Sequence, residues 1–200
     1  MSPIFLRENV DSINQICDEL EKYWINLGST KINFARWSSC ILTDIISTSI
    51  TGKKSFATSI YYNSLPNSLK SEIPENVINE SLKFFDSIHM FVSSFLFFFI
   101  FPPFIRHNFP IFKSLQKKYK NNNDWLNDEI EKIINKRKQE IENIPIDQPI
   151  EYNILNLLIT ANTERDINKI SGVDYMRPMN DKEIRDTFKE IYAAGVDTVS

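Results

Sequence analysis

The sequence has little glycine and no excess of positive charge. Only 4 of its 200 residues are glycine, which is too few for the many tight turns of an all-β protein. The formal net charge is −3, whereas a general nucleic-acid-binding domain usually carries a basic surface. These absences argue against an all-β fold and against nucleic acid as a partner.

Cysteine is also scarce, with Cys17 and Cys40 the two in the chain. They form no C-x-x-C pair and have no neighbouring histidine in the sequence, and His89 and His107 lie far apart. We therefore predict no metal site from these residue types. Both cysteines are expected to be small buried apolar side chains, in a reduced, intracellular protein.

No segment has the length or pattern of a signal peptide or a membrane-spanning helix. The first residues lack a charged stretch followed by an apolar one. The strongest apolar run, residues 90–105, is shorter than the ~20 residues that cross a bilayer. Pro102 and Pro103 also interrupt it. We interpret this run as a buried or interfacial segment rather than a transmembrane helix.

Apolar residues recur at steps of three or four through most of the chain, which is typical of amphipathic helices. No window shows the alternation of a strand, so we predict an all-α fold, with little or no strand, as a single partial domain over residues 1–200. Residues 53–73 are expected to be a polar connector with a short helical turn. The basic run at residues 136–138 is interpreted as a solvated helix face. The expected helices are residues 4–27, 33–51, 74–98, 124–143, 151–161 and 180–200.

Several residues mark where these helices begin and end. Gly28 and Gly52 are predicted to end the first two helices, and Asn33 is predicted to cap the second. The three asparagines at 121–123 predict a break, after which Asp124 would cap the next helix.

The last helix combines a good start with a poor interior. Asn180 can cap it, and Glu183 lies at the spacing of a capping box. Further along, Gly195, Asp197 and Thr198 are all unfavourable inside a helix, since glycine costs about 1 kcal/mol relative to alanine and the other two compete for backbone hydrogen bonds. Three residues of poor helix propensity within four positions indicate that this segment serves a function rather than helix stability.

Ala194-Gly195-x-Asp197-Thr198 resembles the A-G-x-[DE]-T signature in the central helix of the cytochrome P450 family. Residues 42–52, 136–138 and 154–160 are similar, in the same order, to segments that precede that helix in the family. The resemblance covers most of the chain. It implies a haem monooxygenase that activates dioxygen, hydroxylates an apolar small molecule and receives electrons from a reductase.

The resemblance also implies roles for individual residues. Thr198 would hydrogen-bond the dioxygen and help to protonate it, and Asp197 would relay protons from solvent. Ala194 and Gly195 would form the groove over the haem. Residues 91–104 are similar to the segment that roofs the substrate pocket and, in membrane-bound members, dips towards lipid. The expected pocket residues are Phe91, Phe95, Phe98, Phe188 and Ile191.

Three haem-site motifs of the family are not found in the chain: the cysteine loop F-x-x-G-x-x-x-C-x-G, the E-x-x-R pair and W-x-x-x-R. We therefore assign no iron ligand and expect a partial chain, running from after the W-x-x-x-R helix into the central helix. The full-length parent would hold the haem, with a position at the endoplasmic-reticulum membrane. The chain alone would not hold haem stably and would be inactive.

Two alternatives remain open. Asp197 and Thr198 also fit a solvent-facing polar pair on an amphipathic helix, and the phenylalanine cluster also fits a core. The whole chain could instead be a non-catalytic helical module that binds a membrane or a partner through its phenylalanine-rich segment.

Overall fold

A computed structural model describes residues 3–66, 68–70, 73–166 and 177–197. Within these ranges the chain forms eight helices and no strand, which confirms the predicted all-α fold. The helices are α1 (Pro3–Leu27), α2 (Phe34–Thr51), α3 (Ala57–Ser64), α4 (Glu75–Ile100), α5 (Pro103–Asn108), α6 (Pro110–Glu142), α7 (Ile154–Thr160) and α8 (Asp181–Asp197).

The predicted ends of the first two helices are confirmed. The Asn33 side chain accepts a hydrogen bond from the backbone N–H of Arg36 at 3.2 Å and so caps α2. Gly52 ends α2 with φ 71°, in the left-handed region that glycine occupies without strain. Gly28 follows the last residue of α1 with φ 58°. Hydrogen bonds between residues close in sequence set these boundaries, which is why the sequence predicts them.

The predicted break at residues 121–123, with a new cap at Asp124, is wrong. α6 runs through this segment as one helix of 33 residues. The Asn122 amide donates to the backbone carbonyl of Ser87 on α4 at 2.9 Å. A partner on another helix thus satisfies a side chain that would otherwise favour a turn, and packing overrides the weak helix propensity of asparagine.

The connector between α2 and α4 contains a helix of 8 residues, α3, rather than a single turn. Its first turn is held by Asp44 of α2, which is 0% exposed. The Asp44 carboxylate accepts hydrogen bonds from the backbone N–H groups of Ala57 at 2.8 Å and Thr58 at 3.0 Å, and from the Ser55 hydroxyl at 2.5 Å. These donors and the positive end of the helix dipole compensate for burying the carboxylate.

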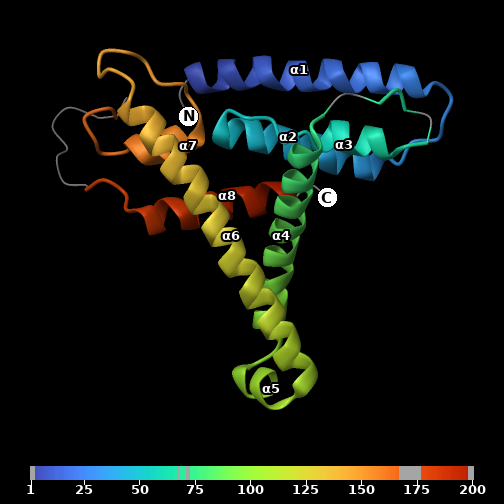
Figure 1. The fold of residues 1–200 in the computed structure, drawn as a ribbon, viewed down its shortest axis with the longest axis vertical. Coiled ribbons are helices and arrows are strands. Elements are labelled where there is room, and N and C mark those ends of the chain that lie inside the picture. The colour runs from blue at the N-terminus through green and yellow to red at the C-terminus, as the bar shows by residue number, and fades with distance from the viewer. Residues whose placement is uncertain (1–2, 67, 71–72, 167–176, 198–200) are drawn as a thin grey trace.

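α8 packs against four other helices, α2, α4, α6 and α7. Figure 1 shows α1 and α2 running along one side of the molecule, with α4 and α6 extending away from them as a pair. The main core forms where this pair crosses α8. Its buried residues are Ile50, Ile88, Leu126, Ile130, Ile134, Leu155, Ile184, Phe188 and Tyr192.

The far ends of α4 and α6, together with α5, project beyond the other helices, as Figure 1 shows. We call this region, residues 95–112, the tip. Phe97 is 5% exposed and packs among neighbouring rings, but Phe99 is 91%, Phe104 74% and Ile111 79% exposed. α4 is apolar and long enough to cross a membrane by length and composition alone, a test that a core helix of a soluble protein also passes. The interpretation of this run as buried or interfacial stays a prediction.

Candidate functional site

The start of α8 has the predicted capping box. The backbone N–H of Glu183 donates to the Asn180 side chain at 3.0 Å, and the backbone N–H of Asn180 donates to the Glu183 carboxylate at 2.9 Å. Arg177 forms two further hydrogen bonds to that carboxylate, at 2.8 and 2.6 Å. Hydrogen bonds from Arg177 and then from the Asn180 backbone lower the pKa of Glu183 to about 2. The carboxylate therefore stays charged next to the positive end of α8.

The apolar face of α8 fixes how the helix is rotated in the core. Ile184 is 1%, Phe188 0% and Tyr192 2% exposed. The Tyr192 ring packs edge-on against Phe84 of α4, with ring centroids 5.3 Å apart. Its hydroxyl is hydrogen-bonded to Ser47 of α2, and burial raises the pKa of Tyr192 far above its usual range. Tyr192 is therefore a neutral hydroxyl that links α8 to α2.

Gly195 packs closely against Ile46 of α2. A Cβ atom built on it would lie 2.6 Å from Cδ1 and 3.0 Å from Cγ1 of Ile46. The missing side chain therefore gives room to Ile46, whereas Ala194 beside it is exposed. The predicted role of both residues, a groove over a haem, stays a prediction, and close helix packing is a second physical reason for this glycine.

The predicted proton-relay pair falls at the end of the described residues. Asp197 is the last residue of α8, and its side chain lies outside the described part of the chain. Thr198 also lies outside it. Both assignments stay predictions based on the signature.

The structure brings some of the predicted pocket residues together and separates others. Phe91 and Ile191 pack against the core cluster that contains the fully buried Phe188. Phe95 stacks edge-on against Phe91, with centroids 4.8 Å apart, but is 56% exposed. Phe98, one turn further along α4, is 39% exposed and belongs to the tip. The five residues therefore run from the core outwards, and their role in a substrate pocket stays a prediction.

Neither cysteine is placed as an iron ligand. Cys40 is buried in α2, and burial raises the pKa of its thiol to about 11, so that it stays protonated. Cys17 is exposed on α1, where the prediction of a buried side chain is wrong. No group of three or more His, Cys, Asp or Glu side chains that could hold a metal occurs among the described residues. The assignment of no iron ligand to this chain stays a prediction.

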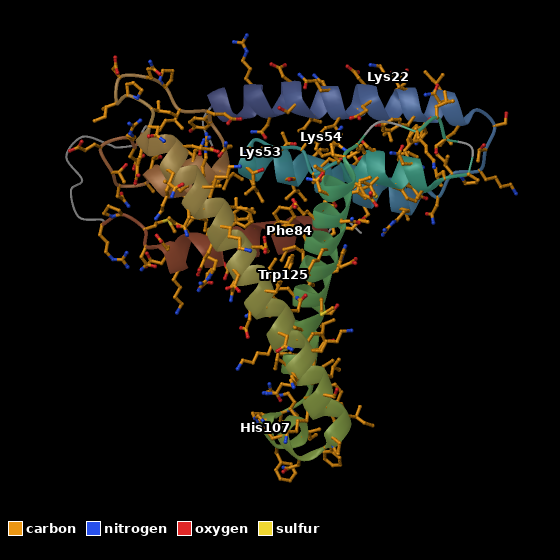
Figure 2. The ribbon with its side chains drawn as sticks, in the orientation of Figure 1. Lys22, Lys53, Lys54, Phe84, His107 and Trp125 are labelled. Atoms are coloured by element: carbon orange, nitrogen blue, oxygen red, sulfur yellow. The ribbon has the colours of Figure 1, made fainter. Side chains whose placement is uncertain are left out.

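The described structure contains a hollow that the sequence did not predict. It has a volume of about 670 Å³ and lies between α4 and α6, over α8 and the end of α2. Figure 2 labels Phe84 and Trp125 on its walls, with Lys53 and Lys54 above them. We call it the α4–α6 cleft. Lys136 and Arg137, interpreted from sequence as part of a solvated face, are among its lining residues. No short-range pattern marks it, because its residues come from separate helices.

Residues 5–200 match the family model described as Cytochrome P450. Neither the curated proteins nor the solved structures contain a match to this chain. The match therefore covers nearly all of α1 and the whole of α2 to α8, and it is not limited to the signature at residues 194–198.

Proposed function

The chain belongs to the cytochrome P450 family, an oxidoreductase family of haem monooxygenases, and we propose that it supplies the distal, oxygen-activating side of such an enzyme. The single observation that supports this is the family match over residues 5–200, because it includes α8 together with the helices that hold it in place. The substrate would be an apolar small molecule, and a reductase would supply the electrons.

In this proposal the end of α8 handles protons. The Thr198 hydroxyl both donates and accepts hydrogen bonds, so it can hold a proton next to bound dioxygen. The Asp197 carboxylate can take a proton from water and pass it on. Bound haem would supply the iron chemistry of oxygen activation. The contribution of the described residues is to fix α8 between α2, α4 and α6.

We further propose that these 200 residues do not hold haem through a thiolate by themselves. This rests on the buried, protonated Cys40 and on the position of Cys17 on α1, away from α8. Mixed with haem and reduced under carbon monoxide, the chain alone is expected to show no thiolate-type Soret band. A stable band of that type would contradict this part of the proposal.

A chimera tests the catalytic role. Residues 1–200 would replace the corresponding segment of an active cytochrome P450 that keeps its own cysteine loop. We expect this chimera to show the thiolate-type band and to oxidise an apolar substrate with its reductase. The variants Asp197→Asn and Thr198→Ala should keep the band but form less product per reducing equivalent, with more peroxide released.

A matched control is Thr187→Ala, a change on α8 ten residues before Asp197. It should leave both the band and the product yield unchanged. If the chimera binds haem but Thr198→Ala keeps the full product yield, the proton-handling role is wrong.

The exposed tip supports a second candidate function, peripheral contact with a membrane. Phe99, Phe104 and Ile111 are exposed together at the end of the α4–α6 pair. Figure 2 places His107 at this end, away from the rest of the molecule. Arg106 lies 4.7 Å from the centroid of the Phe98 ring, so a cation is available next to the apolar surface for lipid headgroups.

Vesicle flotation tests this contact. The chain should co-float with vesicles of phosphatidylcholine and phosphatidylserine, and Phe99→Ser with Phe104→Ser should reduce the bound fraction severalfold. The control Val10→Ser with Ile25→Ser changes exposed apolar residues of α1 and should leave binding unchanged. Equal binding by both double variants would exclude the tip as the contact. If the chain fails to float at all, the hypothesis of a helical module that binds a membrane is wrong.

A further inference from the structure

The α4–α6 cleft has the size of a small-molecule site. Its volume of about 670 Å³ lies within the ~300–1,000 Å³ that such sites occupy. Helices α2, α4, α6, α7 and α8 all contribute to its lining. The loop after α2 completes the lining with Lys53, Lys54 and Ser55.

One side of the cleft is aromatic. Phe84 and Phe85 of α4 and Trp125 of α6 line it, and all three are half-buried. Phe188 and Tyr192 of α8 continue this surface into the core. Aromatic faces arranged in this way favour a flat, apolar body, because rings prefer stacked or edge-on contact with other rings.

The charged lining is predominantly positive. The cations are Lys53, Lys54, Lys83, Lys132, Lys136 and Arg137, and the carboxylates are Glu80, Glu129 and Glu140. Six cations therefore face three carboxylates. An anion would enter this cleft more readily than a cation.

Partners within the protein already neutralise some of these cations. Lys132 pairs with Glu129 at 2.7 Å, and Arg137 pairs with Glu140 at 2.8 Å. Lys54 pairs with Glu19 of α1.

The remaining cations form no ion pair with a carboxylate in the described part of the chain. Lys83 lies over the Trp125 ring, 4.1 Å from its centroid. No ion pair joins Lys53 or Lys136 to a described residue, yet both act on the Glu140 carboxylate and help to lower its pKa, after the larger effect of Arg137. Lys53, on the loop after α2, and Lys136, on α6, both line the cleft, and Glu140 lines it near them.

We propose that the α4–α6 cleft binds a small aromatic carboxylate, with its ring between Phe84 and Trp125 and its charge between Lys53 and Lys136. This goes beyond the monooxygenase function, because the cleft is separate from the signature. Neither Ala194 nor Gly195 lines it, and among the described predicted pocket residues only Phe188 does. The site is thus a second binding site, with a lining that does not include the described residues of the signature's proposed cofactor groove.

Fluorine NMR of the full chain labelled with 5-fluorotryptophan tests the site with 2-naphthoate as the probe. The chain has three tryptophans, and Trp24 and Trp37 lie in the separate cluster of α1, α2 and α3. The Trp125 resonance, assigned with Trp125→Phe, should shift saturably while the other two stay in place. The double variant Lys53→Gln with Lys136→Gln should raise the Kd by on the order of 3- to 10-fold, as two exposed charge contacts would.

Three comparisons separate the site from non-specific binding. Lys22→Gln is the charge control, because Figure 2 places Lys22 on α1 away from the cleft, and it should leave the Kd unchanged. Lys53→Arg with Lys136→Arg should keep the affinity. The uncharged probe 2-naphthamide should bind more weakly than 2-naphthoate.

The proposal is overturned if Trp125 does not respond up to the solubility limit of the probe. It is equally overturned if all three tryptophans shift together, or if the glutamine variant binds as tightly as the arginine variant. Far-UV circular dichroism of each variant confirms that the helices are retained, so that a lost signal reports on the site.

Discussion

The two ends of the α4–α6 pair carry the same kind of side chain in different surroundings. Where the pair crosses α8, Ile88 and Phe188 are 0% exposed. At the tip, Phe99 is 91% and Phe104 74% exposed. Two helices bury only the stripe between them, so a third helix is needed to cover the rest of their apolar surface. The difference shows that coverage by α8, as well as composition, decides which faces of α4 become core, while at the tip Phe97 on the stripe between the helices is buried.

The two ends also differ in how their helices begin. Asn180 caps α8, Asn33 caps α2 and Asn153 caps α7, each with a side-chain hydrogen bond. At the tip, α5 and α6 begin at Pro103 and Pro110 with no side-chain cap. The starts of α8, α2 and α7 are therefore fixed by specific hydrogen bonds, whereas α5 and α6 rely on the restricted φ of proline. α4 is an exception at the supported end, because it begins after Pro74 without a side-chain cap.

The largest expected effect compares one phenylalanine from each end. Phe188→Ala should lower the free energy of unfolding by about 3–5 kcal/mol, because it leaves a cavity in the core. Phe99→Ala should change it by no more than ~0.5 kcal/mol, as for other exposed positions. Urea unfolding followed by circular dichroism measures both. Equal losses in the two variants would mean that the tip is covered in solution, and the contrast between the ends would not hold.

A second, smaller effect concerns a close contact at the supported end. Alanine at position 195 gains about 1 kcal/mol of helix propensity, but its methyl group would meet Cδ1 of Ile46 at 2.6 Å. Gly195→Ala should therefore be neutral or destabilising alone, and stabilising when Ile46→Val removes that atom. We expect a coupling of about 1–2 kcal/mol in the double-mutant cycle. Zero coupling would mean that Ile46 does not restrict position 195. The open face of Gly195 would then be explained by a flat ligand, as the signature predicts.

Much of the fold was predictable because its signals are local. The caps at Asn33 and Asn180 and the end at Gly52 depend on groups no more than four residues apart. The error at residues 121–123 has the opposite origin. The partner of Asn122 is the carbonyl of Ser87 on another helix, and no short-range pattern could indicate it.

The candidate site was predictable to a lesser extent, for the same reason. The signature at Ala194–Thr198 is a short string, so it identified α8 and the family. The contact between Gly195 and Ile46 joins distant segments, and so does the convergence of Lys53 and Lys136 on one cleft. The resemblance grouped Phe98 with Phe91 as pocket residues, but α4 extends past its covering neighbours before it reaches Phe98, which is 39% exposed.

The third prediction tests the side-chain cap that distinguishes α8 from the tip helices. Asn180→Ala removes the acceptor for the Glu183 backbone N–H, and it should cost about 1 kcal/mol of unfolding free energy. The matched control Asn180→Asp keeps an acceptor and should differ from the natural chain by only a few tenths of a kcal/mol. Urea unfolding measures both. If alanine and aspartate are equivalent, the cap does not contribute to holding α8.

The smallest effect is the pH dependence of that same cap. The pKa of Glu183 is lowered from 4.5 to about 2, so folding favours its charged form. The resulting stabilisation is complete above the unfolded pKa of 4.5 and is lost as the pH falls towards about 2. A carboxyl titration by NMR should give the low pKa directly. Arg177→Gln should raise it most of the way back, because the Arg177 hydrogen bond is the larger cause. If Arg177→Gln leaves the pKa low, the Asn180 backbone alone holds the carboxylate, and the start of α8 is specified by the capping box without help from the preceding loop.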